Sequence, residues 1–274
     1  MTFNQLRRGV GTAISFTAFG LGGLVIGLLV APILLLVVRN DIKRQRLTRE
    51  LIRQSFRAFI GLMRVMGVAE SHIGDAQRLQ RPGLLILANH PSLIDVIYLI
   101  AHTPNANCIV NGHLVRNPFT RGPIKAAGYI TNSDPEAVLE AATASLQAGN
   151  SLILFPEGTR TTPGQPIQFR RGGANIALHS GVPITPVLIR CTPTTLTKGE
   201  PWYHIPPSRI RMELQVLADL PLPADPHLPV RHRARAITAW LTDYFNTELE
   251  QFSHGRDTRA VAGNKTDDYR HAGA

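Results

Sequence analysis

The sequence GLLILANHPSLID, which spans residues 83–95, decides the fold of this chain. Its first six residues form a short apolar run typical of a buried strand, and Pro91 favours the first turn of a helix. His90 therefore lies in the turn between strand and helix, and Asp95 follows where its carboxylate can reach the imidazole. A neutral, paired imidazole can accept a proton from a hydroxyl group. The alternative is a capping box between Ser92 and Asp95, with His90 as a plain turn residue.

A second apolar run leads into a polar turn in the sequence SLILFPEGTR, residues 151–160. In parallel α/β sheets, ligands collect beyond the carboxyl ends of the strands. If both strands run the same way, His90 and the turn at residues 157–160 border a single site.

Three motifs occur in a fixed order: H-x-x-x-x-D at His90 and Asp95, FPEGTR at residues 155–160, and VPITPV at residues 182–187. In this order they resemble the glycerolipid acyltransferase family, which includes bacterial 1-acyl-sn-glycerol-3-phosphate acyltransferases. The resemblance covers about residues 66–220. It implies an α/β fold of the glycerol-phosphate acyltransferase type, with a mixed, largely parallel sheet flanked by helices.

The resemblance also implies an acyltransferase that moves a fatty acyl group from a thioester to an alcohol. His90 and Asp95 are the predicted catalytic pair: His90 removes the hydroxyl proton, and Asp95 holds the ring and stabilises the imidazolium. The predicted substrate-binding residues are Glu157, Gly158, Thr159, Arg160 and Arg171. They would position the acceptor and line the developing oxyanion. No G-x-S-x-G motif is present, so we expect direct attack without an acyl-enzyme.

The chain departs from the family in the segment GYITNS, residues 128–133, where the family has an arginine implicated in holding the acceptor's phosphate. Threonine and asparagine cannot reproduce the bidentate grip of a guanidinium on phosphate. Arg160, or Arg170 with Arg171 before a glycine pair, could take over the anion. The other reading of Arg170 and Arg171 is a solvated loop.

Three functions remain in view. The leading hypothesis is acyl transfer to a lysophospholipid, foremost 1-acyl-sn-glycerol-3-phosphate, giving phosphatidic acid. The second is the same transfer to another lysolipid, a hydroxylated lipid or a specialised acyl or polyene product, and the missing arginine motivates it. The third is a non-catalytic lipid-binding membrane protein. Acyl coenzyme A or an acyl carrier protein thioester is the expected co-substrate, with no bound cofactor, and oligomeric state is left open.

We expect neither a metal site nor nucleic-acid binding. His102 and His113 fit no metal-ligand spacing together with His90 and Asp95, and Cys108 and Cys191 form no paired motif. The formal net charge of +10 fits an anionic membrane surface or an acidic carrier protein, because no nucleic-acid motif accompanies it.

Between Arg8 and Arg39 the chain carries no charged residue, which gives a segment longer than the roughly 20 residues that cross a bilayer as a helix. One tilted span is expected; a re-entrant hairpin is the runner-up, and a signal peptide fits poorly because the apolar segment is too long. Basic residues are denser after this segment than before it. The positive-inside rule then predicts the cell inner membrane with the catalytic domain on the cytoplasmic face.

The predicted domain organisation has four parts. Residues 1–65 comprise the membrane helix and a basic amphipathic helix resting on anionic headgroups, for which a core-facing helix is the alternative. Residues 66–222 form the catalytic domain. A C-terminal amphipathic helix at residues 223–252 packs on the domain or touches the membrane, and a disordered tail occupies residues 253–274.

Overall fold

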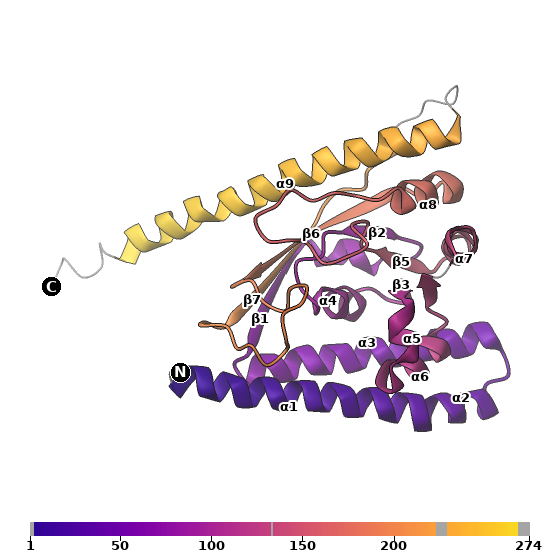
Figure 1. Cartoon of the computed structure of the whole chain (residues 1–274), viewed down its shortest axis with the longest axis horizontal. Helices are drawn as coiled ribbons and strands as arrows, with labels where there is room; N and C mark the ends of the chain where they lie inside the picture. The colour runs from indigo at the N-terminus through magenta and orange to yellow at the C-terminus, as the bar shows by residue number, and fades with distance from the viewer. Residues whose placement is uncertain (1–2, 133, 223–228, 268–274) are drawn as a thin grey trace.

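The chain folds as a twisted sheet with helices on both faces, seen in a computed structural model that describes residues 3–132, 134–222 and 229–267 (Figure 1). The strands are β1 (Ala69–Gly74), β2 (Leu85–Ala88), β3 (Ala106–Asn111), β4 (Ile130–Asn132), β5 (Ser151–Leu154), β6 (Ile184–Thr192) and β7 (Ile210–Val216). The helices are α1 (Phe3–Val25), α2 (Ala31–Val37), α3 (Asp41–Val65), α4 (Asp95–His102), α5 (Gly112–Arg116), α6 (Pro118–Ala127), α7 (Pro135–Gln147), α8 (Gly172–Ser180) and α9 (Val230–Asp267). A π-helical turn, η1 (Ile26–Val30), joins α1 to α2, and a 3-10 turn, η2 (Ala76–Gln80), precedes β2.

The sheet is mixed and largely parallel, with strand order β1-β7-β6-β2-β5-β3-β4. β2 pairs in parallel with β5 on one side and β6 on the other. β7 runs antiparallel to β6, and β1 runs parallel to β7. The predicted fold class is confirmed, and the strands before His90 and before the EGTR turn are adjacent and point the same way.

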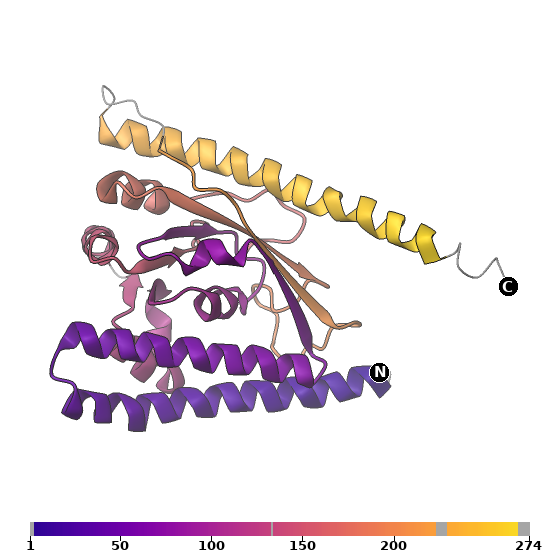
Figure 2. The same ribbon diagram turned by 180° about the vertical axis from the view of Figure 1, so that it is seen from behind.

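Alternate side chains of the central strands enter different cores. Ile86 and Ile153 pack with α3 and α4 residues, whereas Leu85, Leu87 and Leu152 pack with α7, α8 and α9 residues. All of these strand side chains are fully buried. Because both faces are covered, the strands read as continuous apolar runs rather than as alternating ones. Figures 1 and 2 show α1 and α3 on one side of the sheet and α9 on the other.

The N-terminal segment α1–η1–α2 is long and apolar enough to cross a membrane, and α3 returns beside it. One side of this segment packs on the domain. Gly27 and Gly122 bring η1 against α6, where an added Cβ on Gly122 would lie 2.4 Å from the Gly27 Cα. Arg8 is buried, and its guanidinium donates hydrogen bonds to the carbonyls of Pro206 and Pro207 at 3.2 and 2.7 Å. The N-terminal segment thus packs along the domain, and it stays long and apolar enough for the one tilted span that the sequence predicts.

α3 follows the core-facing alternative rather than resting its apolar face on headgroups. Ile52, Phe59 and Met63 are buried in the main core, and the helix contacts α4 and β1. Arg49 is also buried and donates to the Ala127 carbonyl at 2.8 Å. The apolar stripe of this helix is therefore committed to the protein interior.

Three element boundaries differ from the sequence prediction. α4 begins at Asp95 instead of Pro91, since the Leu93 amide donates to the Leu196 carbonyl and holds the preceding turn out of the helix. β1 was not predicted, because AESHIG lacks strand periodicity and becomes a strand only by pairing with β7.

The third difference is the C-terminal end. α9 packs on the domain through Ala234, Ile237, Leu241 and Phe245, as one of the two expected arrangements proposed. It continues to Asp267, so the expected disorder is corrected for residues 253–267. The polar sequence of residues 253–267 has no apolar stripe that could pack on a core. A helix nevertheless satisfies its backbone hydrogen bonds internally, so it can continue without such packing. Residues 223–228 and 268–274 lie outside the described residues.

Candidate active site

His90 lies directly beyond the carboxyl end of β2, where its ring is held from two sides. Its Nδ1 is 3.0 Å from Oδ2 of Asp95, which also accepts the Ser92 backbone N–H at 2.7 Å. The ring stacks on Phe155 with 4.0 Å between ring centroids. A carboxylate at Nδ1 favours the tautomer with its proton there, which leaves Nε2 as the proton acceptor. The predicted pair is thus in contact. Asp95 also accepts the hydrogen bond from the Ser92 backbone N–H, which is one of the two bonds of the expected capping box.

Asp95 is completely buried, and this burial controls its ionisation. Burial raises the pKa of Asp95 to about 6, while the hydrogen bond from His90 opposes the rise. Its Oδ1 is buried and has no hydrogen-bond partner among the described residues. An ionised carboxylate in this position depends on the imidazole for compensation, so it holds the ring firmly when ionised.

Glu157, in the turn after β5, grips the backbone of His90. Its Oε1 accepts the His90 backbone N–H at 2.9 Å and the Thr161 hydroxyl at 2.7 Å. The Thr161 amide in turn donates to the His90 carbonyl at 2.8 Å. Burial raises the pKa of Glu157 as well. The two turns are therefore joined at His90, and Thr161 is a positioning residue that the sequence analysis missed, although it directly follows the EGTR motif.

Arg160 connects the same turn to the loop after β6. Its Nη1 donates to the carbonyls of Leu196 and Thr197, both at 2.8 Å. Its Nε and Nη2 have no hydrogen-bond partner among the described residues, so those N–H groups are available to an anion. The Leu196 carbonyl also accepts from Leu93 in the His90 turn. These carbonyl partners could not be predicted from the sequence, because a backbone acceptor has no residue-type signature.

Gly158 and Thr159 lie exposed at the tip of this turn. Gly158 has φ of +69°, and a Cβ there would lie 3.0 Å from Nε of Arg170, so both conformation and space favour glycine. Arg171 borders a cavity that His90 does not line. It precedes α8 and lines a hollow of about 490 Å³ between residues 168–171 and α9. The structure therefore brings together every predicted site residue except Arg171.

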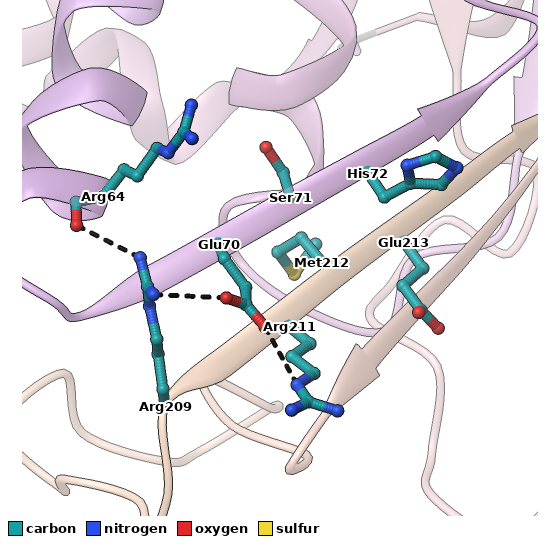
Figure 3. Close-up of a pocket in the computed structure, with 8 residues that line it drawn as sticks. All are labelled: Arg64, Glu70, Ser71, His72, Arg209, Arg211, Met212 and Glu213. Carbon is teal, nitrogen blue, oxygen red and sulfur yellow. Dashed lines mark hydrogen bonds and ion pairs between the residues drawn. The ribbon is translucent and has the colours of Figure 1, made fainter. Parts of the chain in front are cut away.

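A separate hollow of about 310 Å³ lies on β1 and β7 (Figure 3). Its charged side chains largely neutralise one another, because Glu70 pairs with Arg209 at 3.2 Å and with Arg211 at 2.9 Å. Glu213 pairs with Arg190 at 2.7 Å. Its acids and two of its three guanidiniums are already paired, and its imidazole, His72, has no carboxylate partner among the described residues, so this hollow lacks the His–carboxylate pair of the site at His90.

The two cysteines are unsuited to nucleophilic chemistry in this fold. Cys108 and Cys191 are buried and unpaired, and burial raises the pKa of each thiol to about 12. A thiol reacts as its thiolate, so neither competes with His90 as the chemical centre. Across the described ranges, no group of three or more His, Cys, Asp or Glu side chains could hold a metal ion.

A mixed sheet with a His–Asp pair at the carboxyl ends of its parallel strands defines an α/β domain of the acyltransferase type. The acyltransferase family model matches residues 71–190. The crystal structure of the 1-acyl-sn-glycerophosphate (LPA) acyltransferase PlsC from Thermotoga maritima shares the fold, with a TM-score of 0.62 and 19% identity over 88% of this chain and 98% of that chain. In sequence over residues 71–190 and in fold, this chain is similar to acyltransferases.

Curated relatives match the same region. The 1-acyl-sn-glycerol-3-phosphate acyltransferase of Helicobacter pylori is 33% identical over 112 residues, which are 38% of this chain and 47% of that protein. The enzyme of that name from Pseudomonas aeruginosa is 26% identical over 145 residues, 51% of this chain and 56% of that protein. The one from Cocos nucifera is 30% identical over 115 residues, 39% of this chain and 37% of that protein. The chain thus spans roughly half or less of the length of these relatives.

Proposed function

We propose that this protein is a membrane-bound O-acyltransferase that moves a fatty acyl group from an acyl thioester to the hydroxyl of a lysophospholipid. The observation that carries the proposal is the arrangement of the His90 ring: Nδ1 is held by the buried Asp95, and Nε2 has no partner among the described residues. The ring lies at the carboxyl ends of β2 and β5, where the turn at residues 157–160 also lies. The acceptor we favour is 1-acyl-sn-glycerol-3-phosphate, which the names of the curated relatives support.

The proposed reaction is a direct displacement. Nε2 of His90 takes the acceptor's hydroxyl proton as the oxygen attacks the thioester carbonyl. The new C–O bond forms, the C–S bond breaks, and the imidazolium returns the proton to the departing thiolate. Asp95 stabilises the imidazolium between these steps, and general base catalysis of this kind contributes on the order of 10² to 10⁴ in rate.

Arg160 is the guanidinium best placed to hold the acceptor's phosphate in the absence of the family arginine. Two backbone carbonyls fix its Nη1, which orients the remaining N–H groups without neutralising the charge. A fixed guanidinium can bind phosphate through two parallel hydrogen bonds. Replacement of the family arginine by β4 residues such as Thr131 and Asn132 motivates the second candidate, the same transfer to a different lysolipid or hydroxylated acceptor.

Membrane attachment through α1, η1 and α2 completes the proposal. Their outward side exposes twelve large apolar side chains: Phe3, Leu6, Val10, Ile14, Leu21, Val25, Leu28, Leu29, Ile33, Leu35, Leu36 and Val37. A continuous apolar surface of this kind is stabilised by contact with lipid. We propose that the protein is attached to the cell inner membrane with its catalytic domain on the cytoplasmic side. Basic residues are denser after the apolar segment than before it, and the positive-inside rule then predicts this orientation.

The proposal is tested with His90→Ala and, as a matched control, His179→Ala, which removes an exposed histidine on α8. Purified variants are given labelled acyl thioester and a panel of lysolipids. We expect His90→Ala to lose at least about 100-fold in rate and the control to keep the parental rate. Transfer by His90→Ala at the parental rate would refute the chemistry, and a preference for another lysolipid would select the second candidate.

A further inference from the structure

A cationic pocket, which His90 does not line, lies between residues 168–171 and α9. It has a volume of about 490 Å³. Its lining residues are Gln168, Phe169, Arg170, Arg171, Arg235, Thr238, Ala239, Thr242 and Asp243. It contains three guanidiniums and one carboxylate, and neither the imidazole nor Asp95 borders it.

The walls of this pocket are fixed by specific contacts. The side-chain amide of Asn246 on α9 accepts the Ile167 amide at 2.9 Å and donates to the Ile167 carbonyl at 3.2 Å. Phe169 packs edge-on against Phe245 with 4.9 Å between ring centroids. The Arg170 amide donates to the Pro156 carbonyl at 2.8 Å. The loop is therefore tied to α9 on one side and to the turn of the active site on the other.

The guanidiniums of Arg170, Arg171 and Arg235 form no ion pair with an acidic residue in the part of the chain that the structure describes. In the β1–β7 hollow, in contrast, Arg209 and Arg211 both pair with Glu70. Clustering three unpaired arginines costs repulsion, which a bound anion relieves. A planar guanidinium favours phosphate among such anions.

We propose that this pocket binds the phosphate of the acyl donor, either that of coenzyme A or that of a carrier protein's phosphopantetheine. The inference rests on the proposed acyl transfer and names the site of its second substrate. In both donors a pantetheine arm separates the phosphate from the thioester, so the phosphate site must lie away from His90. The contact of Arg170 with the Gly158 turn places the pocket beside the reaction centre without opening onto the imidazole.

The acceptor fits this pocket less well. In a lysophosphatidate the phosphate is only a few bonds from the reacting hydroxyl, so it must bind close to Nε2 of His90. The pocket also lies on the α9 side of the sheet, opposite the exposed apolar residues of α1 and α2 (Figure 1). A water-soluble donor reaches that side freely, whereas a lipid held at α1 does not.

The test uses the full-length protein with Arg235→Glu and Arg171→Glu. Charge reversal should raise the KM for acyl coenzyme A or acyl carrier protein on the order of tenfold, with the acceptor KM unchanged. Arg235→Lys should recover part of the affinity. Acyl-pantetheine, a donor without phosphate, should react with the same kinetics in the parent and the variants. A general structural defect would instead slow the reaction of this donor as well.

A matched charge reversal, Arg78→Glu in η2, which does not line the pocket, should leave all constants unchanged. Calorimetric titration with free coenzyme A and with unacylated carrier protein requires no turnover, so it tests the pocket even if acyl transfer itself fails. The proposal is overturned if both ligands bind parent and Arg235→Glu equally, if acyl-pantetheine loses as much as acyl coenzyme A, or if the acceptor KM rises instead.

Discussion

The turn after β2 and the turn after β5 each place a buried carboxylate beside His90, yet the two carboxylates hold different parts of it. Asp95 bonds to the imidazole, and Glu157 bonds to the backbone N–H. Burial raises the pKa of both acids. A buried carboxylate can therefore play either of two roles. Bonded to the imidazole it assists proton transfer, and bonded to the backbone N–H it fixes the position of His90.

The largest effect on activity should come from Asp95, the carboxylate bonded to the imidazole ring. Asp95→Asn keeps the size of the side chain but lets an amide face Nδ1, which favours the wrong tautomer and leaves the imidazolium without its counter-charge. We expect kcat to fall on the order of 10³ to 10⁴. Acyl-transfer rates at saturating substrate measure it. A loss of less than about tenfold would mean that Asp95 does not orient the ring.

The activity of Glu157 variants should depend on whether the new side chain can accept hydrogen bonds, and not on whether it carries a charge. Glu157→Gln retains an oxygen for the His90 N–H and the Thr161 hydroxyl, so we expect a loss of only about threefold to tenfold. Glu157→Ala removes both hydrogen bonds and should cost on the order of 100-fold, because His90 is no longer positioned. Equal losses in the two variants would show that the charge itself serves the reaction, which would erase the contrast with Asp95.

The third effect concerns stability and its dependence on pH, and it leaves the reaction rate aside. The folded-state pKa of Asp95 is raised to about 6, above its unfolded value, so its contribution is fully present below about pH 4 and is lost as pH rises through 6. Asn cannot titrate. Asp95→Asn should therefore gain stability relative to the parent as pH rises from about 3 to about 7, by up to about 3 kcal/mol.

Denaturant unfolding of both proteins across this pH range measures the change. The quantity of interest is how the difference in free energy of unfolding varies with pH, since the lost hydrogen bond lowers the variant's stability equally at every pH. A difference that stays constant, or that shifts toward the parent as pH rises, would show that Asp95 is not held at a raised pKa.

Sequence reasoning succeeded where the signal is local. The apolar runs before His90 and before residue 155 predicted two strands, which the structure has as β2 and β5. It failed for β1, which needs β7 beside it, and for α3, whose basic amphipathic pattern fits a headgroup layer and a protein core equally well. An amphipathic pattern shows that one side is buried but not against what.

The site divides in the same way. The sequence alone determined the acyltransferase motifs and the pairing of His90 with Asp95, because five positions across a turn bring those side chains within reach. Only the tertiary structure decided that Glu157 holds the His90 backbone, that Arg160 is fixed by carbonyls of a distant loop, and that Arg171 joins Arg235 on α9. Such contacts link segments far apart in the chain, and the packing of the sheet and its helices sets which backbone atoms meet.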